Sequence, residues 1–181
     1  MVDRIRRIND AITSAEYFVT VTLFAIMLIL MLIQVIFRYF LEIPLGWSEE
    51  AARYLYISTT FLGAAIAVKE RDHIEINFIT VLFNKFADQP QFREKLIKIG
   101  NLVRDGLAII FLSIVSYHTW FFALDQYLYN IRSTAMFFPM YILSGTVLLS
   151  CLLMVLHYIF TIYLNLNNTG ITGYEPVEED A

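Results

Sequence analysis

Two histidines are the side chains whose type and spacing first suggest chemistry. His118 and His157 each lie within a long apolar run, as the axial ligands of a membrane haem do in anchor subunits of respiratory enzymes. Their depths argue against a shared iron, because His118 lies about 9 Å from one end of its run and His157 lies near the opposite end of its own. In a hydrocarbon core about 30 Å thick, the rings are then roughly 10 Å apart in depth. A haem-site or quinone-site anchor subunit of a respiratory enzyme is kept as one possible function, although the depths of the two histidines do not favour it.

Other patterns that carry chemistry are missing from the sequence. There is no glycine-rich phosphate loop, metal-spaced cluster or nucleophile motif, and the single cysteine, Cys151, permits no internal disulfide. The apolar runs also lack an acid or base for an ion relay, and they lack the polar stripe that a self-assembling channel needs. We therefore expect no enzyme activity, no catalytic residue, no resident metal or cofactor and no nucleic-acid partner.

A compact ionic group opens the second long apolar run. Glu49 precedes Arg53 by four residues and Glu50 precedes it by three, so both carboxylates can reach the guanidinium on one helical face. Ser48, directly before them, occupies a position typical of an N-cap. A local ion pair of this kind is worth only a few tenths of a kcal/mol. The alternative interpretation is an ionic contact to a partner protein.

Small side chains follow on the same predicted helix. Thr60, Gly63, Ala64 and Ala67 recur at three- and four-residue spacing, which lets another membrane helix approach closely. Together with the ionic group they predict a protein interface. Arg38, which ends the first apolar run, and Trp47, just before this helix, are assigned to the same interface.

The elements that position these residues are membrane helices. The chain of 181 residues is 58% hydrophobic and 17% charged, which places it among integral membrane proteins. Runs of sufficient length to cross a bilayer predict spans at about 17–37, 48–68, 107–124 and 137–164. We expect an all-α fold with one membrane domain over residues 1–164, followed by an acidic, disordered tail over 165–181.

An amphipathic segment follows the second span. Large apolar residues alternate with polar ones from about residue 74, and the segment is too polar to cross a bilayer. We expect an interfacial arm at about 74–104, lying along the membrane surface. Its apolar anchors are Ile74, Phe78, Leu82 and Phe86.

The distribution of basic residues predicts the orientation. The segment before the first span and the link between the second and third spans carry ten of the thirteen lysines and arginines. The remaining three lie in the other two links or just inside the second span. The ten are Arg4, Arg6, Arg7, Lys69, Arg71, Lys85, Arg93, Lys95, Lys98 and Arg104; the three are Arg38, Arg53 and Arg132. By the positive-inside rule both termini are cytoplasmic, in a bacterial inner membrane.

The order of these features resembles one family, the small membrane subunit of tripartite ATP-independent periplasmic (TRAP) transporters, called DctQ-like. The residues that carry the resemblance are Arg38, then PLGWSEEAARY over 44–54, then FLGAAIAV over 61–68, and the charged run to Ile74. Four spans, an arm after the second span and cytoplasmic termini are also similar to that family.

The resemblance implies a non-catalytic subunit that forms a heterodimer with a large membrane subunit and acts as a static scaffold beside it. The large subunit would carry the sodium and substrate sites, and a periplasmic binding protein would deliver an organic acid of the C4-dicarboxylate or sialic acid class. The interface residues above would pack on the large subunit. Contacts to the binding protein are expected at Glu42, Asp125 and Arg132.

Overall fold

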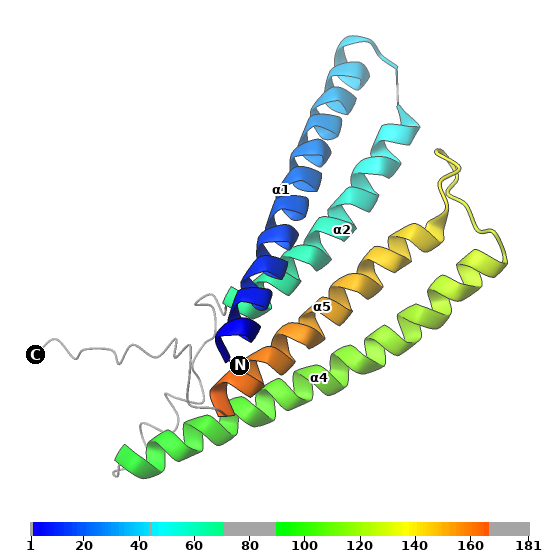
Figure 1. Cartoon of the computed structure of the whole chain (residues 1–181). Coiled ribbons are helices and arrows are strands. Elements are labelled where there is room, and N and C mark those ends of the chain that lie inside the picture. The colour runs from blue at the N-terminus through cyan, green and yellow to red at the C-terminus, as the bar shows by residue number, and fades with distance from the viewer. Residues whose placement is uncertain (1, 44, 71–89, 167–181) are drawn as a thin grey trace, which may run out of the picture.

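The computed structural model describes residues 2–43, 45–70 and 90–166, and these form a helical protein (Figure 1). The helices are α1 (Val2–Phe40), α2 (Gly46–Glu70), α4 (Pro90–Leu128) and α5 (Met140–Leu166). The described residues contain no β-strand and only one isolated β-bridge, between Arg132 and Pro139. The predicted all-α class is thus confirmed.

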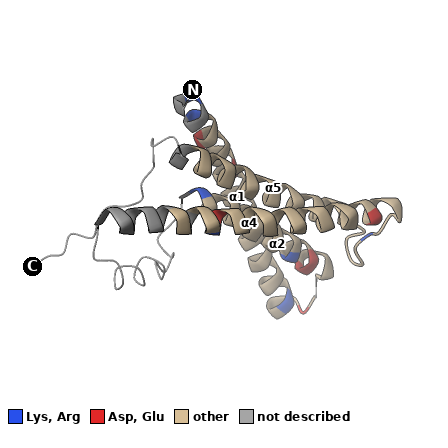
Figure 2. Ribbon diagram, turned by 90° about the horizontal axis from the view of Figure 1, so that it is seen from below, with Lys and Arg blue, Asp and Glu red and all other residues tan. Residues whose placement is uncertain are grey.

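Each helix contains a stretch that is long and apolar enough to cross a membrane. The four stretches are Arg7–Phe40, Gly46–Lys69, Leu102–Leu128 and Met140–Tyr163. Charged residues gather towards the helix ends, and most of the ribbon between them carries none (Figure 2). Four apolar helices with charged ends are what a multi-pass membrane protein requires, because a helix satisfies its backbone polar groups internally.

The order of packing is α1, α2, α5, α4. Helix α2 packs along both α1 and α5, and α4 packs along α5, whereas α1 touches α5 over a short stretch only. Helices α1 and α4 therefore lie at opposite edges of the described structure (Figure 1). A small core joins α2 to α5, where Ala65, Cys151 and Met154 are all buried.

The two ends of the helix assembly differ. At the terminal end, α1 begins and α5 finishes; at the loop end, residues 41–45 join α1 to α2 and residues 129–139 join α4 to α5 (Figure 1). The longer link is folded: Ser133 N donates to Phe138 O at 2.9 Å, and Met140 N donates to Ile131 O at 3.1 Å. Asn130 and Phe137 adopt positive φ angles of 48° and 54°, which allow the chain to reverse here.

The helices begin and end at different residues from the predicted spans. Helix α1 starts fifteen residues before residue 17, at Val2, and α4 starts at Pro90, so the charged segment before the third span is helical. Helix α5 begins later than residue 137, at Met140, because Phe137 has a left-handed backbone and Pro139 pairs in the bridge.

Ser48 does not act as the predicted N-cap. Helix α2 begins at Gly46, and the Ser48 hydroxyl donates to Leu45 O at 2.9 Å instead of accepting from a later backbone N–H. Its side chain is fully buried, so the hydroxyl bonds back to the nearest carbonyl.

Parts of two predictions lie outside the described residues. The arm anchors Ile74, Phe78, Leu82 and Phe86 fall in the segment 71–89, and most of the predicted tail falls in 167–181. The remaining part of the predicted arm, from Pro90 to Arg104, belongs to α4.

Candidate functional site

Helix α2 presents one narrow exposed stripe. Its exposed residues recur at three- and four-residue intervals, with Gly63 half-buried beside them, and the rest of the described helix is largely covered by α1 and α5. The stripe consists of Glu49, Arg53, Tyr56, Thr60, Ala64 and Ala67, and is called the α2 stripe below. It is charged at the loop end and made of small side chains towards the terminal end. A membrane helix from another subunit can therefore approach the small part closely.

The charged part of the α2 stripe is a surface ion pair. Arg53 Nη2 lies 3.4 Å from Glu49 Oε1, and the two side chains are 65% and 59% exposed. A pair this exposed contributes little to stability, because water competes for both charges. Both groups thus remain accessible to a partner.

Glu50 has a different environment from the one expected. Its Oε2 accepts hydrogen bonds from the backbone N–H groups of Ala135 and Met136, both at 2.9 Å. Its Oε1 accepts from the Tyr54 hydroxyl at 2.7 Å, and that hydroxyl lies 3.2 Å from Met140 Sδ. Glu50 therefore ties α2 to the α4–α5 link, and it is not part of the exposed stripe. By spacing either acid could reach Arg53, and in the structure Glu49 is the one that pairs with it.

A groove runs beside the α2 stripe, between α1 and α2. It has a volume of about 330 Å³ and is lined by Thr20, Val21, Phe24, Tyr56, Thr59 and Thr60. The Thr20 hydroxyl oxygen is buried without a hydrogen-bond partner among the described residues. Because Tyr56 and Thr60 belong to both groove and stripe, the two form one continuous surface.

The other residues assigned to interfaces lie at the loop end. Arg38, in the last turn of α1, and Trp47, in the first turn of α2, are exposed. Glu42, with a φ angle of 54°, is exposed in the first link. Asp125 and Arg132 are exposed near and within the second link, where Arg132 Nε donates to Asn130 Oδ1 at 3.2 Å.

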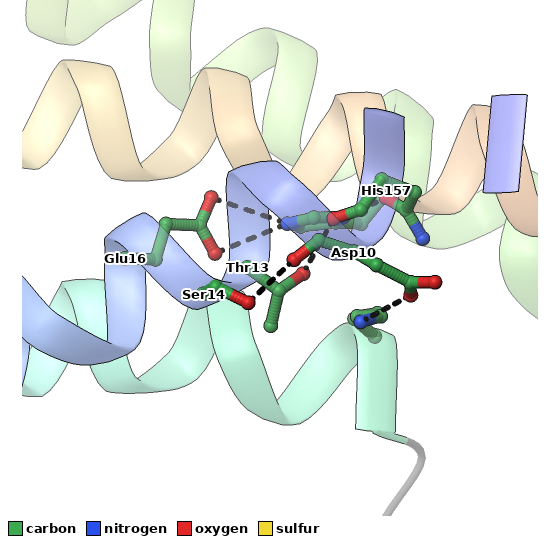
Figure 3. Close-up of polar contacts among 7 residues, drawn as sticks. Asp10, Thr13, Ser14, Glu16 and His157 are labelled. Carbon is green, nitrogen blue, oxygen red and sulfur yellow. Dashed lines mark hydrogen bonds and ion pairs between the residues drawn. The ribbon is translucent and has the colours of Figure 1, made fainter. Parts of the chain in front are cut away.

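The two histidines occupy unlike environments. His118 is exposed on α4 and meets the ring of Tyr117 edge-on. His157 is fully buried: its Nδ1 lies 2.8 Å from Asn9 Oδ1 and its Nε2 lies 3.2 Å from both carboxylate oxygens of Glu16 (Figure 3). An axial ligand needs an unengaged ring nitrogen, so this arrangement does not favour the haem alternative. Within the described part of the chain, no group of three or more His, Cys, Asp or Glu is placed to hold a metal ion.

Comparison with known proteins places the chain in a family. Residues 27–168 match the family of tripartite ATP-independent periplasmic transporters, DctQ component. The chain belongs to the DctQ family. The match begins within α1 and covers the last third of that helix and all of α2, α4 and α5, so it includes both the α2 stripe and the folded α4–α5 link. The DctQ chain is accordingly a small permease component of a TRAP transporter and a multi-pass membrane protein.

Individual relatives agree with this family. A protein of Haemophilus influenzae named as a TRAP transporter small permease protein is 30% identical over 115 residues, which is 64% of this chain and 66% of that protein. The sialic acid TRAP transporter small permease protein SiaQ of Vibrio cholerae is 34% identical over 76 residues, 42% of this chain and 44% of SiaQ. The aligned parts therefore span about two thirds of one relative and under half of the other.

A third relative is a longer protein. The sialic acid TRAP transporter permease protein SiaT of Haemophilus influenzae is 36% identical over 61 residues, which is 34% of this DctQ chain but 10% of SiaT. The similar segment is thus a small part of a much longer permease chain.

Sequence reasoning missed two polar contacts in this DctQ chain. Glu50 reaches backbone groups 85 and 86 residues away, and His157 reaches side chains 148 and 141 residues away. No local spacing reports contacts at such separations. One signal was present: Asn9, Thr13 and Glu16 are spaced by four and three residues, which predicts a polar face on a helix starting before residue 17.

Proposed function

We propose that this DctQ chain is the non-catalytic scaffold subunit of a sodium-driven TRAP transporter that imports an organic acid. The α2 stripe is the observation that carries the proposal. Its part towards the terminal end is a surface of small residues, exposed between two covered flanks of a helix that is otherwise packed against its neighbours. Small side chains exposed in this way serve helix–helix contact in a membrane, because they let another helix approach closely.

The partner at the α2 stripe is the large membrane subunit of the transporter, in a heterodimer. Small side chains at Thr60, Ala64 and Ala67 let its helix approach, and the adjoining groove accepts a protruding side chain. Glu49 and Arg53 then meet polar groups at the membrane surface. The SiaT alignment supports such a pairing, because a segment similar to this chain is there part of a longer permease.

The loop end is the proposed contact for a periplasmic binding protein. Exposed charges of both signs gather there, Glu42 and Arg132 on the two links and Asp125 in the last turn of α4. Ten of the thirteen basic residues precede the first span or lie in sequence between the second and third spans, which supports cytoplasmic termini and a periplasmic loop end. Sodium and substrate bind in the large subunit, and the substrate belongs to the sialic acid or C4-dicarboxylate class.

The assembly can be tested with bulky residues on the α2 stripe. Ala64→Leu combined with Ala67→Leu adds volume only on an exposed face, so the chain itself should fold. We expect at least a tenfold loss of the large subunit in co-purification from membranes, with a matching loss of uptake. Ala25→Leu, on an exposed face of α1, is the matched control and should leave both unchanged. Normal recovery and normal uptake with the double variant would exclude the α2 stripe as the interface.

Substrate and coupling need a transport measurement. Cells that express the chain with its large subunit and binding protein are supplied with radiolabelled sialic acid or a C4-dicarboxylate, with and without sodium. We expect uptake of one acid, abolished when sodium is replaced by choline. Uptake that persists without sodium would contradict the coupling, and uptake of neither acid would contradict the substrate class.

A further inference from the structure

The buried face of α1 changes character along its length. Its inward residues follow an alternating spacing of four and three, the spacing of a helix seam. From the terminal end they are Asn9, Thr13, Glu16, Thr20, Leu23, Met27 and Leu30. The first part of this seam is polar and the later part apolar. Burying a polar group in a membrane costs free energy unless the group has a hydrogen-bond partner. The polar part of α1 is therefore stable only opposite residues that supply such partners.

His157 of α5 supplies those partners. It is fully buried, and Asn9 and Glu16 are only 4% and 6% exposed. One ring therefore bridges two side chains that lie two turns apart on α1, with contacts of 2.8 Å to Asn9 and 3.2 Å to Glu16 (Figure 3). The Thr13 hydroxyl, between them, donates to Asn9 O at 2.9 Å within its own helix.

The chemistry of the three groups allows both ring nitrogens to be satisfied. When Nε2 carries the ring hydrogen, it can donate to the Glu16 carboxylate, which only accepts when ionised. The Asn9 amide offers an oxygen to a protonated Nδ1, and after rotation an N–H to an unprotonated one. Both ring nitrogens are thus engaged by side chains of α1, and the three residues are called the clamp below.

The clamp lies at the one place where α1 and α5 meet. These helices touch over a short stretch, whereas each packs along α2 over most of its length. Beside the clamp, Asp10 of α1 forms an ion pair of 2.9 Å with Lys69 of α2 (Figure 3). Sliding α1 by one turn, about 5.4 Å, would separate His157 from both partners and leave a carboxylate buried without a donor.

We propose that Asn9, Glu16 and His157 form a register clamp that fixes the axial position of α1 against α5. Apolar packing alone specifies register weakly, because a leucine fits a neighbouring site nearly as well. A buried polar group fits only the site that holds its hydrogen-bond partner. A single buried asparagine sets the register of coiled coils in this way. The proposal does not depend on the transport function of the chain.

The test replaces the clamp by apolar residues and measures position. The full chain carries Phe40→Cys and Leu128→Cys for spin labels, at sites 82% and 66% exposed near the loop ends of α1 and α4. The native Cys151 is 1% exposed, so it should not take up label, which labelling of the chain without added cysteines verifies. Distances are measured by pulsed electron resonance in lipid nanodiscs.

The clamp variant combines Asn9→Leu, Glu16→Leu and His157→Leu, which leaves no polar member of the clamp unpaired. We expect it to insert and to keep its helix content. The label distance, which should be single and narrow in the unmodified chain, should split or broaden with a displaced component as α1 slides along its axis. The control combines Ser14→Leu and Thr22→Leu, on exposed faces of α1, and should retain the narrow distance.

Two results would overturn the proposal. A clamp variant with the same narrow distance as the unmodified chain would show that register is set elsewhere. A clamp variant that fails to insert while the control inserts would show that the three residues supply stability that apolar packing cannot replace, and not register. Glu16→Gln distinguishes charge from hydrogen bonding, since its amide oxygen still accepts from Nε2; a narrow distance is expected there.

Discussion

The carboxylate of Glu50 fixes the α4–α5 link, which lies outside the helices. Its two oxygens accept three hydrogen bonds, from the Tyr54 hydroxyl and the Ala135 and Met136 amides. Hydrogen bonds to a charged acceptor are stronger than those between neutral groups. The neighbouring Glu49, one residue earlier, reaches only Arg53 at the surface. The two adjacent glutamates therefore have different roles: Glu50 binds the α4–α5 link, and Glu49 is exposed at the surface.

Glu50→Gln should loosen the α4–α5 link. Glutamine keeps one acceptor oxygen but places an NH2 donor where the second carboxylate oxygen was, so the backbone donors lose their charged acceptor. We expect several-fold faster hydrogen–deuterium exchange at the Ala135 and Met136 amides. Glu49→Gln is the matched control and should leave exchange in the link unchanged. Equal exchange in both variants would show that Glu50 does not hold the link.

Local spacing explains which of these contacts the sequence could predict. The pair of Glu49 and Arg53 was predicted correctly because residues four apart on a helix are neighbours. The partners of Glu50 depend on the path of the link, including the left-handed backbone at Asn130 and Phe137. Asn130 is a residue type that tolerates a left-handed backbone, whereas nothing about Phe137 in the sequence signals that conformation.

Helix α2 has a buried side and an exposed side, and the successive residues Ala64 and Ala65 lie on different sides. Ala65 is fully buried in the core against α5, with Cys151 and Met154, whereas Ala64 is exposed in the α2 stripe. A successive residue on a helix turns by about 100°, so the side chains of neighbours face different environments. Small residues thus serve internal packing at one position and an outer surface at the next.

This difference predicts opposite results for two identical substitutions. Ala65→Leu forces extra volume into a packed core and should destabilise the chain by about 1–3 kcal/mol. Ala64→Leu should change stability by less than about 0.5 kcal/mol, yet reduce recovery of the large subunit. Thermal unfolding in detergent measures the first effect and co-purification the second. Equal losses of stability would show that Ala64 is not on a free face of the chain.

The existence of the four helices could be predicted from hydropathy. The residues at which they begin were less predictable, because they depend on packing. Four apolar runs predicted four helices, because a bilayer-spanning segment must satisfy its own backbone. The start of α1 at Val2 depends on burial of Asn9 and Glu16 against α5, which composition does not report. The start of α5 at Met140 follows from the fold of residues 129–139, and not from hydropathy.

The whole molecule has an orientation that labelling can test. With cytoplasmic termini, a cysteine at the loop end faces the periplasm and one at the terminal end does not. Tyr129→Cys, 77% exposed in the native chain, should react with a membrane-impermeant maleimide in intact cells. Ile8→Cys, 47% exposed, should react only after lysis. The reverse pattern would place the termini outside, and labelling of both in intact cells would contradict a single orientation.

The separation in sequence between Glu16 and His157 has a consequence for biosynthesis. The two residues are 141 positions apart, so the first helix enters the membrane well before its partner has been made. At about 5–20 residues per second, translation of the intervening chain takes roughly 7–30 s. During this interval the carboxylate lies on a nascent hairpin without His157. The burial partner of Glu16 therefore arrives only when α5 has been made. A chain released before α5 would leave this carboxylate of α1 without its contact to His157.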